Sequence, residues 1–391
     1  MTKEGLETER RRLLRDAQRV VIKVGTSIVS GSAGEVSAGY VEPLVRSMTA
    51  LKMAGRQVVL VSSGAVGLGA GRLGLHPSRL GDLVVRQACA AVGQSLLMHA
   101  YEQLFRVHDV RIAQVLLTED DFSDWKRYTN VRRTMEKLLK LGVLPIVNEN
   151  DTVATAELEY VVSSQERVFG DNDRLAALVM SGLESDALIL LTNVDGLLWL
   201  APKNTDGEEG KPIPLVEEIT QELKAIAAGP SAGGRGGMLT KLEAAQIAMQ
   251  AGGVAVIANG MKPGVLNDIF AGEQIGTTFM STSRMAGKRR WITYAAGVRG
   301  RVIVNEGARN AIIGGKASLL SSGVVRVEQQ FESQDVVSIA DSHGCEFARG
   351  IINCASEEAE ALIEGTSAAN PARERARVLV TRDNMVVSER R

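Results

Sequence analysis

Residues 144–179, LPIVNENDTVATAELEYVVSSQERVFGDNDRLAALV, contain the pattern that decides the fold of this chain. An apolar run at residues 143–147 is short enough to be a buried strand of a parallel sheet. The stretch ends in residues 174–179, RLAALV, whose composition favours a helix. Buried strands that alternate with helices build parallel α/β proteins, so this stretch predicts that fold class.

Acidic and amide side chains gather in two places within this stretch. Residues 148–151, Asn-Glu-Asn-Asp, directly follow the predicted strand, at the edge where open α/β sheets bind ligands. Residues 170–173, Gly-Asp-Asn-Asp, directly precede the predicted helix, with an Asn or Asp as its N-cap. A turn or a cap explains either cluster alone. Together they indicate a site for an ammonium group, a metal ion or a backbone amide.

The alternation of strands and helices extends to both sides of this stretch. Further buried strands are predicted at residues 19–24, 57–61, 112–117, 187–191 and 253–259. Helices are predicted at residues 41–54, 83–106 and 130–141, and again from residue 239 onward. From about residue 297, short β-rich pieces between Gly and Ser turns replace the long helices.

These patterns predict the domain organisation. We expect an α/β domain at residues 18–285, a linker at 286–297 that contains Lys-Arg-Arg, and a small, mostly β domain at 298–391. Residues 1–17 form a charged N-terminal extension, for which the sequence leaves open an exposed helix or a disordered arm.

Composition and charge exclude several functions. With 391 residues, of which 45% are hydrophobic and 23% charged, the chain has an ordinary globular composition. The formal net charge is −1, and residues 298–391 hold 12 Lys and Arg against 13 Asp and Glu, which argues against RNA and membrane binding. The three cysteines lack zinc-site spacing and fit a reducing compartment. No secretory signal or membrane-length apolar run is present, so we expect a cytoplasmic protein.

Two lysines stand in positions that call for an anion. Lys23 interrupts the apolar strand at residues 19–24, and an unpaired buried ammonium is costly. Lys241 follows the glycine-rich residues 228–237 in the first turn of a predicted helix, where a cation opposes the helix dipole. An ion pair or edge position is the alternative for Lys23, and a plain flexible loop is the alternative before Lys241. Two such lysines predict a clamp for a polyphosphate.

Two familiar nucleotide motifs are not supported. The Walker A order GxxxxGK[ST] does not occur. Residues 69–74, GAGRLG, match GxGxxG, but they begin well past the preceding strand, so we expect small residues packed in a helix or loop. A nicotinamide-dependent oxidoreductase is therefore a weak alternative. The residues themselves indicate a phosphotransferase without a Walker A motif that acts on a small charged substrate.

Several motifs occur in the order found in one family. IKVGTS, VSSGAVGLG, PIVNENDTVATAE, GDNDRLAALV, LLTNVDGL and GGRGGMLTK resemble the glutamate 5-kinases of the amino acid kinase superfamily. The tail, with GRVIVNEGA and ASLLSSGVVRV, resembles the PUA domain that follows in many bacterial members. The resemblance covers residues 18–388. It implies a three-layer α/β sandwich around a mainly parallel sheet (the amino acid kinase fold), followed by a small, mostly β PUA-like barrel.

The resemblance also implies an activity and a site. The activity is MgATP-dependent phosphorylation of the γ-carboxylate of L-glutamate to γ-glutamyl phosphate, the first step of proline biosynthesis. Lys23 and Lys241 are then catalytic residues that neutralise the phosphates, and Asp173 holds both lysines. Glutamate contacts Ser63, Asp151 and Asn172. ATP is expected on Lys23, Thr192, Asn193, Arg235, Gly236, Gly237, Met238, Leu239, Thr240 and Lys241. Mg²⁺ is expected on phosphate oxygens and water, without direct protein ligands.

The family further implies partners and leaves alternatives. It implies feedback inhibition by free proline, a homodimer or homotetramer, and hand-over of the product to glutamyl phosphate reductase. Residues 158–169 make a longer link than is usual in the family, which bears on the glutamate lid and on proline sensitivity. The alternatives are another amino acid kinase, acting on aspartate, acetylglutamate or carbamate, and an RNA-binding protein that works through residues 298–391.

Overall fold

The computed structural model describes residues 2–31, 34–118, 120–153, 172–198, 212–227, 237–280, 285–315, 317–364 and 377–387. The chain divides into two compact units, each described here by itself. The first unit comprises residues 1–121 and 128–284, and the second comprises residues 122–127 and 285–391.

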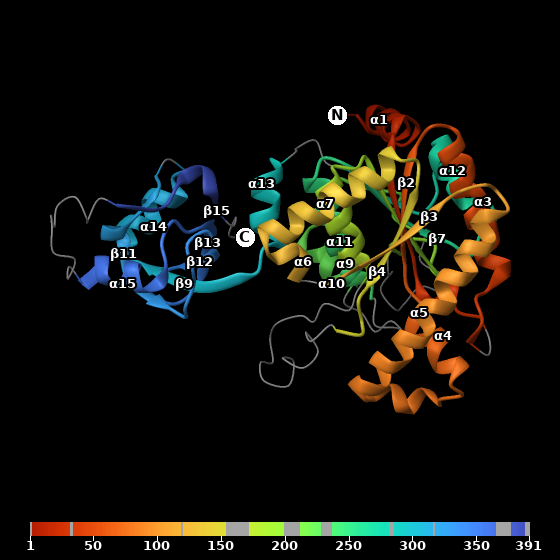
Figure 1. The fold of residues 1–391 in the computed structure, drawn as a ribbon. Helices are drawn as coiled ribbons and strands as arrows, with labels where there is room; N and C mark the ends of the chain where they lie inside the picture. The colour runs from red at the N-terminus through yellow and green to blue at the C-terminus, as the bar shows by residue number, and fades with distance from the viewer. Residues whose placement is uncertain are drawn as a thin grey trace, which may run out of the picture. The chain divides into compact units, whose positions relative to one another are not determined.

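An eight-stranded sheet forms the centre of the first unit (Figure 1). Its strands are β1 (Arg19–Val24), β2 (Gln57–Ser62), β3 (Ile112–Leu117), β4 (Leu144–Glu149), β5 (Ala187–Thr192), β6 (Leu215–Val216), β7 (Val254–Asn259) and β8 (Thr277–Phe279). The strand order is β3-β4-β2-β1-β5-β7-β8-β6, and only the β7–β8 pair is antiparallel. The prediction of a mainly parallel sheet is confirmed, and the carboxyl ends of β1, β2, β4 and β5 meet at one edge.

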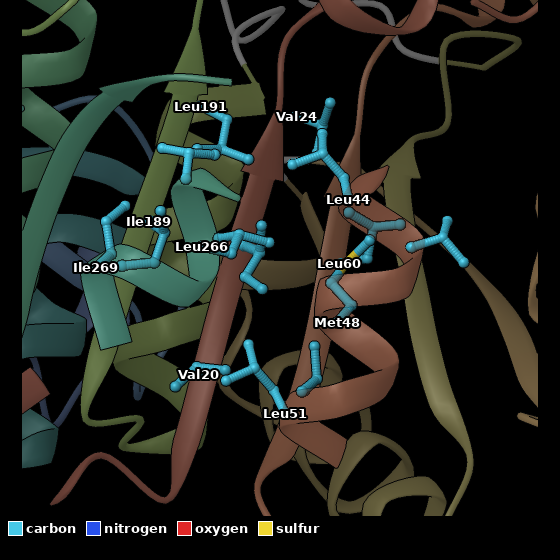
Figure 2. Close-up of a cluster of buried hydrophobic side chains, with 14 of the residues drawn as sticks. Val20, Val24, Leu44, Met48, Leu51, Leu60, Ile189, Leu191, Leu266 and Ile269 are labelled. Carbon is cyan, nitrogen blue, oxygen red and sulfur yellow. The ribbon is translucent and has the colours of Figure 1, made fainter. Parts of the chain in front are cut away.

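Helices cover both faces of this sheet. Alternate strand residues from β1, β2 and β5 pack with α3 and α12 in one hydrophobic core, as Figure 2 shows for Val20, Leu60 and Ile189. On the other face α9 and α11 pack on each other and on β1, β5 and β7. The helices of this unit are α1 (Lys3–Asp16), α2 (Thr26–Val29), α3 (Ala38–Met53), α4 (Ala65–Arg72), α5 (Leu83–Arg106), α9 (Asn172–Leu183), α10 (Gln221–Ala227), α11 (Met238–Gln250) and α12 (Val265–Ala271). Helices α6 (Asp120–Ser123) and α7 (Trp125–Lys140) are divided between the two units, because residues 122–127 belong to the second. The expected three layers are present.

The charged N-terminal segment, for which the sequence left two alternatives, is a helix. Helix α1 places Leu6 and Leu14 in the hydrophobic core of the first unit. The Arg10 side chain is fully buried and donates hydrogen bonds to the carbonyl groups of Gly272 and Glu273. Its guanidinium thereby satisfies carbonyl groups just beyond the end of α12, which anchors α1 to the unit.

Helices α4 and α5 lie in backbone contact because two glycines face each other. A Cβ added at Gly69 would lie 1.8 Å from the carbonyl oxygen of Cys89, and one added at Gly93 would lie 1.7 Å from that of Ala65. No side chain fits in either place. The GxGxxG match at residues 69–74 therefore begins inside α4 and packs a helix, as expected from its distance to the strand.

Some element boundaries differ from the predicted ones. As described, α9 starts at Asn172, so Asn172 and Asp173 lie in its first turn, and Asp171, the other candidate for the cap, lies outside the described residues. Strand β4 continues to Glu149, and α7 begins at Trp125, five residues before the predicted start. The extension of β4 carries Asn148 into the strand, where Gln94 and Asn172 form hydrogen bonds with its side chain.

The second unit is built mainly from strands. Strands β9 (Val298–Val304), β11 (Val324–Glu328), β12 (Val336–Ala340), β13 (Glu346–Ile351) and β15 (Met385–Val387) form a five-stranded sheet in the order β11-β9-β12-β13-β15. Strands β10 (Leu319–Leu320) and β14 (Val378–Val380) form a separate pair, and helices α14 (Glu306–Ile313) and α15 (Ser356–Glu364) accompany them. The region expected as a linker is helical at Gly287–Arg290 and Trp291–Ala295.

Within the described ranges, no helix has the length and apolar character needed to cross a membrane.

Candidate active site

Strand β1 carries a buried charge into the centre of the sheet. Lys23 pairs in register with Val61 of β2 and Leu190 of β5, and it is 6% exposed. Its neighbours Ile22 and Val24 belong to the core on the α3 and α12 side. Because side chains alternate along a strand, Lys23 lies on the opposite face, under α9 and α11. A buried ammonium group at this position requires an anionic partner.

The partner is Asp173, which also binds the second lysine. Lys23 Nζ lies 2.6 Å from Asp173 Oδ1, and Lys241 Nζ lies 2.9 Å from Asp173 Oδ2. The carboxylate is fully buried. Burial by itself raises the pKa of Asp173, but the two ammonium groups outweigh it and hold the pKa below its ordinary value. Asp173 is therefore an anion in the folded protein. Its two ion pairs bring together Lys23 and Lys241, which are far apart in the sequence.

The three side chains carry a net positive charge that favours an anion. The group contains two ammonium groups and one carboxylate, so its three side chains have one more positive than negative charge in a largely buried place. Both oxygens of Asp173 lie on ammonium groups, so this carboxylate is engaged and does not suit direct ligation of a metal ion. The donor set thus fits a phosphate, with any Mg²⁺ held on the phosphate itself.

The start of α11 adds backbone donors beside Lys241. Gly237 is the N-cap and has no side chain, so no side chain of the cap residue occupies the first-turn N–H groups, which are the donors that an anion would use. The Thr240 hydroxyl donates to the Gly237 carbonyl over 2.9 Å and lies 3.3 Å from Asp173 Oδ2. Met238 and Leu239 share this half-buried first turn. Arg235 and Gly236, also expected at ATP, lie outside the described residues.

The neighbouring strand ends continue this side of the site. Thr192 ends β5 beside β1, and its hydroxyl donates to Asn193 Oδ1 over 3.3 Å. Farther along, Asp195 Oδ1 accepts hydrogen bonds from Asn259 Nδ2 over 2.9 Å and from Lys262 Nζ over 2.8 Å. The hydrogen bonds from Lys262 and Asn259 lower the pKa of Asp195. Asn259 and Lys262 were not singled out by the sequence, although Asn259 ends a predicted strand and Lys262 follows it.

Amide groups form the other end of the site. Asn172 Nδ2 donates to Ser63 Oγ over 2.8 Å and to Asn148 Oδ1 over 3.1 Å. Ser63 lies in the turn between β2 and α4, and Asp151 follows the end of β4, where it is half-buried. The structure thus brings Ser63 and Asn172 into direct contact, next in the chain to Asp173. Residues 158–169 lie outside the described residues.

Ser63 is supported by buried groups behind it. Ser62, one residue earlier, has its hydroxyl 2.9 Å from the Tyr101 hydroxyl. Burial raises the pKa of Tyr101 to about 12, so this phenol stays protonated. Gly64 follows with φ of 108°, and a Cβ there would lie 2.8 Å from Val29 Cγ1. This turn therefore requires glycine.

Comparison with known proteins identifies the family to which this chain belongs. A model for the amino acid kinase family matches residues 18–259, and a model for the PUA domain matches residues 300–373. The chain is 46% identical over 349 residues to the glutamate 5-kinase of Moorella thermoacetica, covering 89% of each chain. It is 44% identical over 344 residues to that of Caldanaerobacter subterraneus subsp. tengcongensis, covering 88% of this chain and 89% of the relative. The chain belongs to the amino acid kinase family and, within it, to the glutamate 5-kinases.

Proposed function

We propose that this protein transfers the γ-phosphoryl group of ATP to the γ-carboxylate of L-glutamate, which forms γ-glutamyl phosphate for proline biosynthesis. The proposal is supported by the relatives named above and, above all, by one observation: Lys23 and Lys241 converge on Asp173 beside the helix start at Gly237. That arrangement suits a transferring phosphoryl group, and the amides of Asn172 and Ser63 suit an amino acid acceptor.

The two lysines address the main barrier to this reaction. The attacking carboxylate and the triphosphate are both anionic, so they repel each other as they approach. Lys23 and Lys241 offset this repulsion and stabilise the charge that develops on the equatorial oxygens. Asp173 positions both ammonium groups, so that they need no reorganisation during the reaction. When bound, Mg²⁺ would neutralise further phosphate charge.

The acceptor end supplies binding and orientation. Asp151 and Asn172 suit the α-ammonium group of glutamate, and Ser63 offers a hydroxyl to a carboxylate. Holding the γ-carboxylate in line with the phosphoryl group converts an encounter of two anions into a step within one complex. The carboxylate oxygen then forms the new P–O bond as the bond to the leaving ADP breaks.

Family membership supports three accompanying proposals. Free proline inhibits the enzyme, the chain assembles into a homodimer or homotetramer, and the product passes to glutamyl phosphate reductase, as expected for a labile acyl phosphate. The free cysteines Cys89, Cys345 and Cys354 fit work in a reducing compartment such as the cytoplasm.

The activity can be tested by trapping the product. The full-length protein is incubated with ATP, Mg²⁺, glutamate and hydroxylamine, which converts an acyl phosphate into a hydroxamate. We expect glutamyl hydroxamate, with turnover well above that of aspartate, acetylglutamate or carbamate in parallel reactions. Turnover that favours one of the other acceptors would reassign the protein within its family, and no product from any of them would reject the proposal.

A further inference from the structure

A glutamine side chain with no role in the mechanism above lies behind the acceptor end of the site. Gln94 is in the middle of α5, and its Oε1 accepts a hydrogen bond from Asn148 Nδ2 over 2.9 Å. Asn148, at 2% exposure, accepts in turn from Asn172, which also contacts Ser63. A continuous chain of hydrogen bonds therefore joins α5, β4, α9 and the turn after β2.

One backbone group fixes the direction of this chain. The N–H of Glu149 donates to Asn148 Oδ1 over 2.9 Å, and a backbone N–H can only donate. The Asn148 side chain must therefore direct its NH₂ group to Gln94, which has to present its oxygen. Since Asn148 Oδ1 is the acceptor on the other side, Asn172 must direct its own NH₂ group toward it. The oxygen of Asn172 is the half of that amide left for a ligand.

The two amide atoms at the ends of this hydrogen-bond chain, Asn172 Oδ1 and Gln94 Nε2, agree with this direction. Asn172 Oδ1 is buried and has no hydrogen-bond donor among the residues that the structure describes. Such an oxygen is costly to leave unpaired, and a ligand that carries an N–H or O–H donor would satisfy it. Gln94 Nε2 is likewise buried without a partner in the described part of the chain. The site therefore uses the oxygen of Gln94 and not its nitrogen.

We propose that Gln94 is a positioning residue that holds this amide chain in one orientation, so that Asn172 Oδ1 accepts a hydrogen bond from the α-ammonium group of the substrate. The inference rests on the proposed function, because it takes glutamate as the acceptor. Gln94 acts through Asn148 and Asn172 without touching the substrate. If its oxygen is removed, the NH₂ group of Asn148 loses its partner, and the Glu149 N–H alone holds the Asn148 amide, so the side chains of Asn148 and Asn172 are fixed less firmly.

The position of Gln94 is set by the fold. Its neighbour Gly93 is the residue at which the α5 backbone meets the carbonyl group of Ala65 in α4. That contact fixes the height and rotation of α5 at the level of the site. Gln94 therefore reaches Asn148 from a rigid element, as a positioning residue requires.

Two substitutions and two ligands test this inference. Gln94→Met keeps the volume and removes the oxygen, whereas Gln94→Glu keeps an accepting oxygen in either protonation state. Gln103→Met is the matched control, because Gln103 is exposed on the same helix and its amide contacts Arg106. Each full-length variant is assayed for the KM values of glutamate and ATP. Inhibition by glutarate, which has both carboxylates but no ammonium group, is measured in parallel.

We expect Gln94→Met to raise the glutamate KM about five- to tenfold, the effect of one hydrogen bond, with the ATP KM unchanged. Gln94→Glu and Gln103→Met should stay within about twofold of the unmutated protein. The glutarate inhibition constant should be the same in all of them, because glutarate offers no donor to Asn172 Oδ1. Gln94→Ala, which removes the same oxygen and suits a helix, replaces Gln94→Met if that variant does not fold.

An unchanged glutamate KM in a folded Gln94→Met variant would overturn the inference alone, since the unmutated enzyme remains active. Equal weakening of glutamate and glutarate would also overturn it, because that result indicates a general distortion of the site. Absence of glutamate turnover in the unmutated protein would remove the proposed function and this inference together.

Discussion

The phosphate end and the acceptor end of the candidate site are held together by different forces. At the phosphate end, Lys23 and Lys241 converge on Asp173 through buried ion pairs. At the acceptor end, Ser63, Asn172 and Asn148 are joined by hydrogen bonds between neutral groups. Lys23 lies on β1, and Asp173 and Lys241 lie in the first turns of α9 and α11. The acceptor end begins one residue away from Asp173, at Asn172 of the same helix α9.

This difference separates two tasks. Charges in a low-dielectric place act over several ångströms and suit the stabilisation of charge that moves during a reaction. Neutral amides act at contact distance and in one direction, so they suit recognition of a fixed ligand group. Substitutions at the phosphate end should therefore change kcat and stability, whereas substitutions at the acceptor end should change the KM of the acceptor.

The largest effect is expected at the lysines. Lys241→Ala and Lys23→Ala should each lower kcat about a thousandfold, or about 4 kcal/mol, because each removes an ammonium group that stabilises the transferring phosphoryl group. The measurement is hydroxamate formation at saturating ATP and glutamate. Lys140→Ala, at an exposed position near the end of α7, is the control. If kcat of the Lys241→Ala protein matched that of the control, the two-lysine clamp would be wrong.

The next effect concerns the stability of the same end. Asp173→Asn leaves two buried ammonium groups without their carboxylate, so we expect the free energy of unfolding at neutral pH to fall by about 3 kcal/mol. The pKa of Asp173 in the folded protein is lower than its ordinary value of 3.8. The carboxylate therefore contributes its full stability above that value, and the contribution is lost as the pH falls through the lower, folded-state pKa.

Urea unfolding of the two proteins over a range of pH tests this prediction. The difference in unfolding free energy should be constant from about pH 5 to pH 8 and should shrink below the ordinary carboxyl pKa. A difference that stayed the same down to the acid limit of folding would show that Asp173 contributes through packing and not through its charge.

The smallest effect is expected at the acceptor end. Asp151→Ala should raise the glutamate KM about tenfold, because one charged contact to the ammonium group is lost, while kcat changes by less than about threefold. Steady-state kinetics with glutamate as the varied substrate give both parameters. A loss confined to kcat would place Asp151 with the phosphate end and would remove the division between the two ends.

Much of the fold and the charged part of the site could be predicted from the sequence. The strands are continuous apolar runs, so their positions along the chain can be predicted without the structure. Lys23 and Lys241 were evident because a charge in a buried strand or at a helix start is out of place locally. Local reasoning did not join them to Asp173. That link came from the family resemblance, and the ion pairs now give it a geometry.

The neutral part of the site was less predictable. Asn148 belonged to a recognisable cluster after the predicted strand at residues 143–147, but Gln94 lies in a long helix rich in Ala, Gln and Leu and carries no local signal. Its contact with Asn148 depends on how α5 crosses α4, which neither helix determines alone. Asn172 and Asp173 were expected to precede α9, because Asn and Asp usually cap helices. Both residues lie instead in the first turn of α9 as described, where they bind Ser63 and the two lysines.

The backbone contact at Gly69 and Gly93 connects α4, which begins beside the site, to the whole length of α5. Because no side chains separate α4 and α5 at this contact, we expect the two helices to move together as one rigid body. Helix α4 begins at the turn of Ser63 and Gly64, beside Asn172. Helix α5 continues from the contact to Arg106, and the whole helix has 24 residues and is roughly 36 Å long. A tilt of that turn would therefore be magnified at Arg106, far from the chemistry.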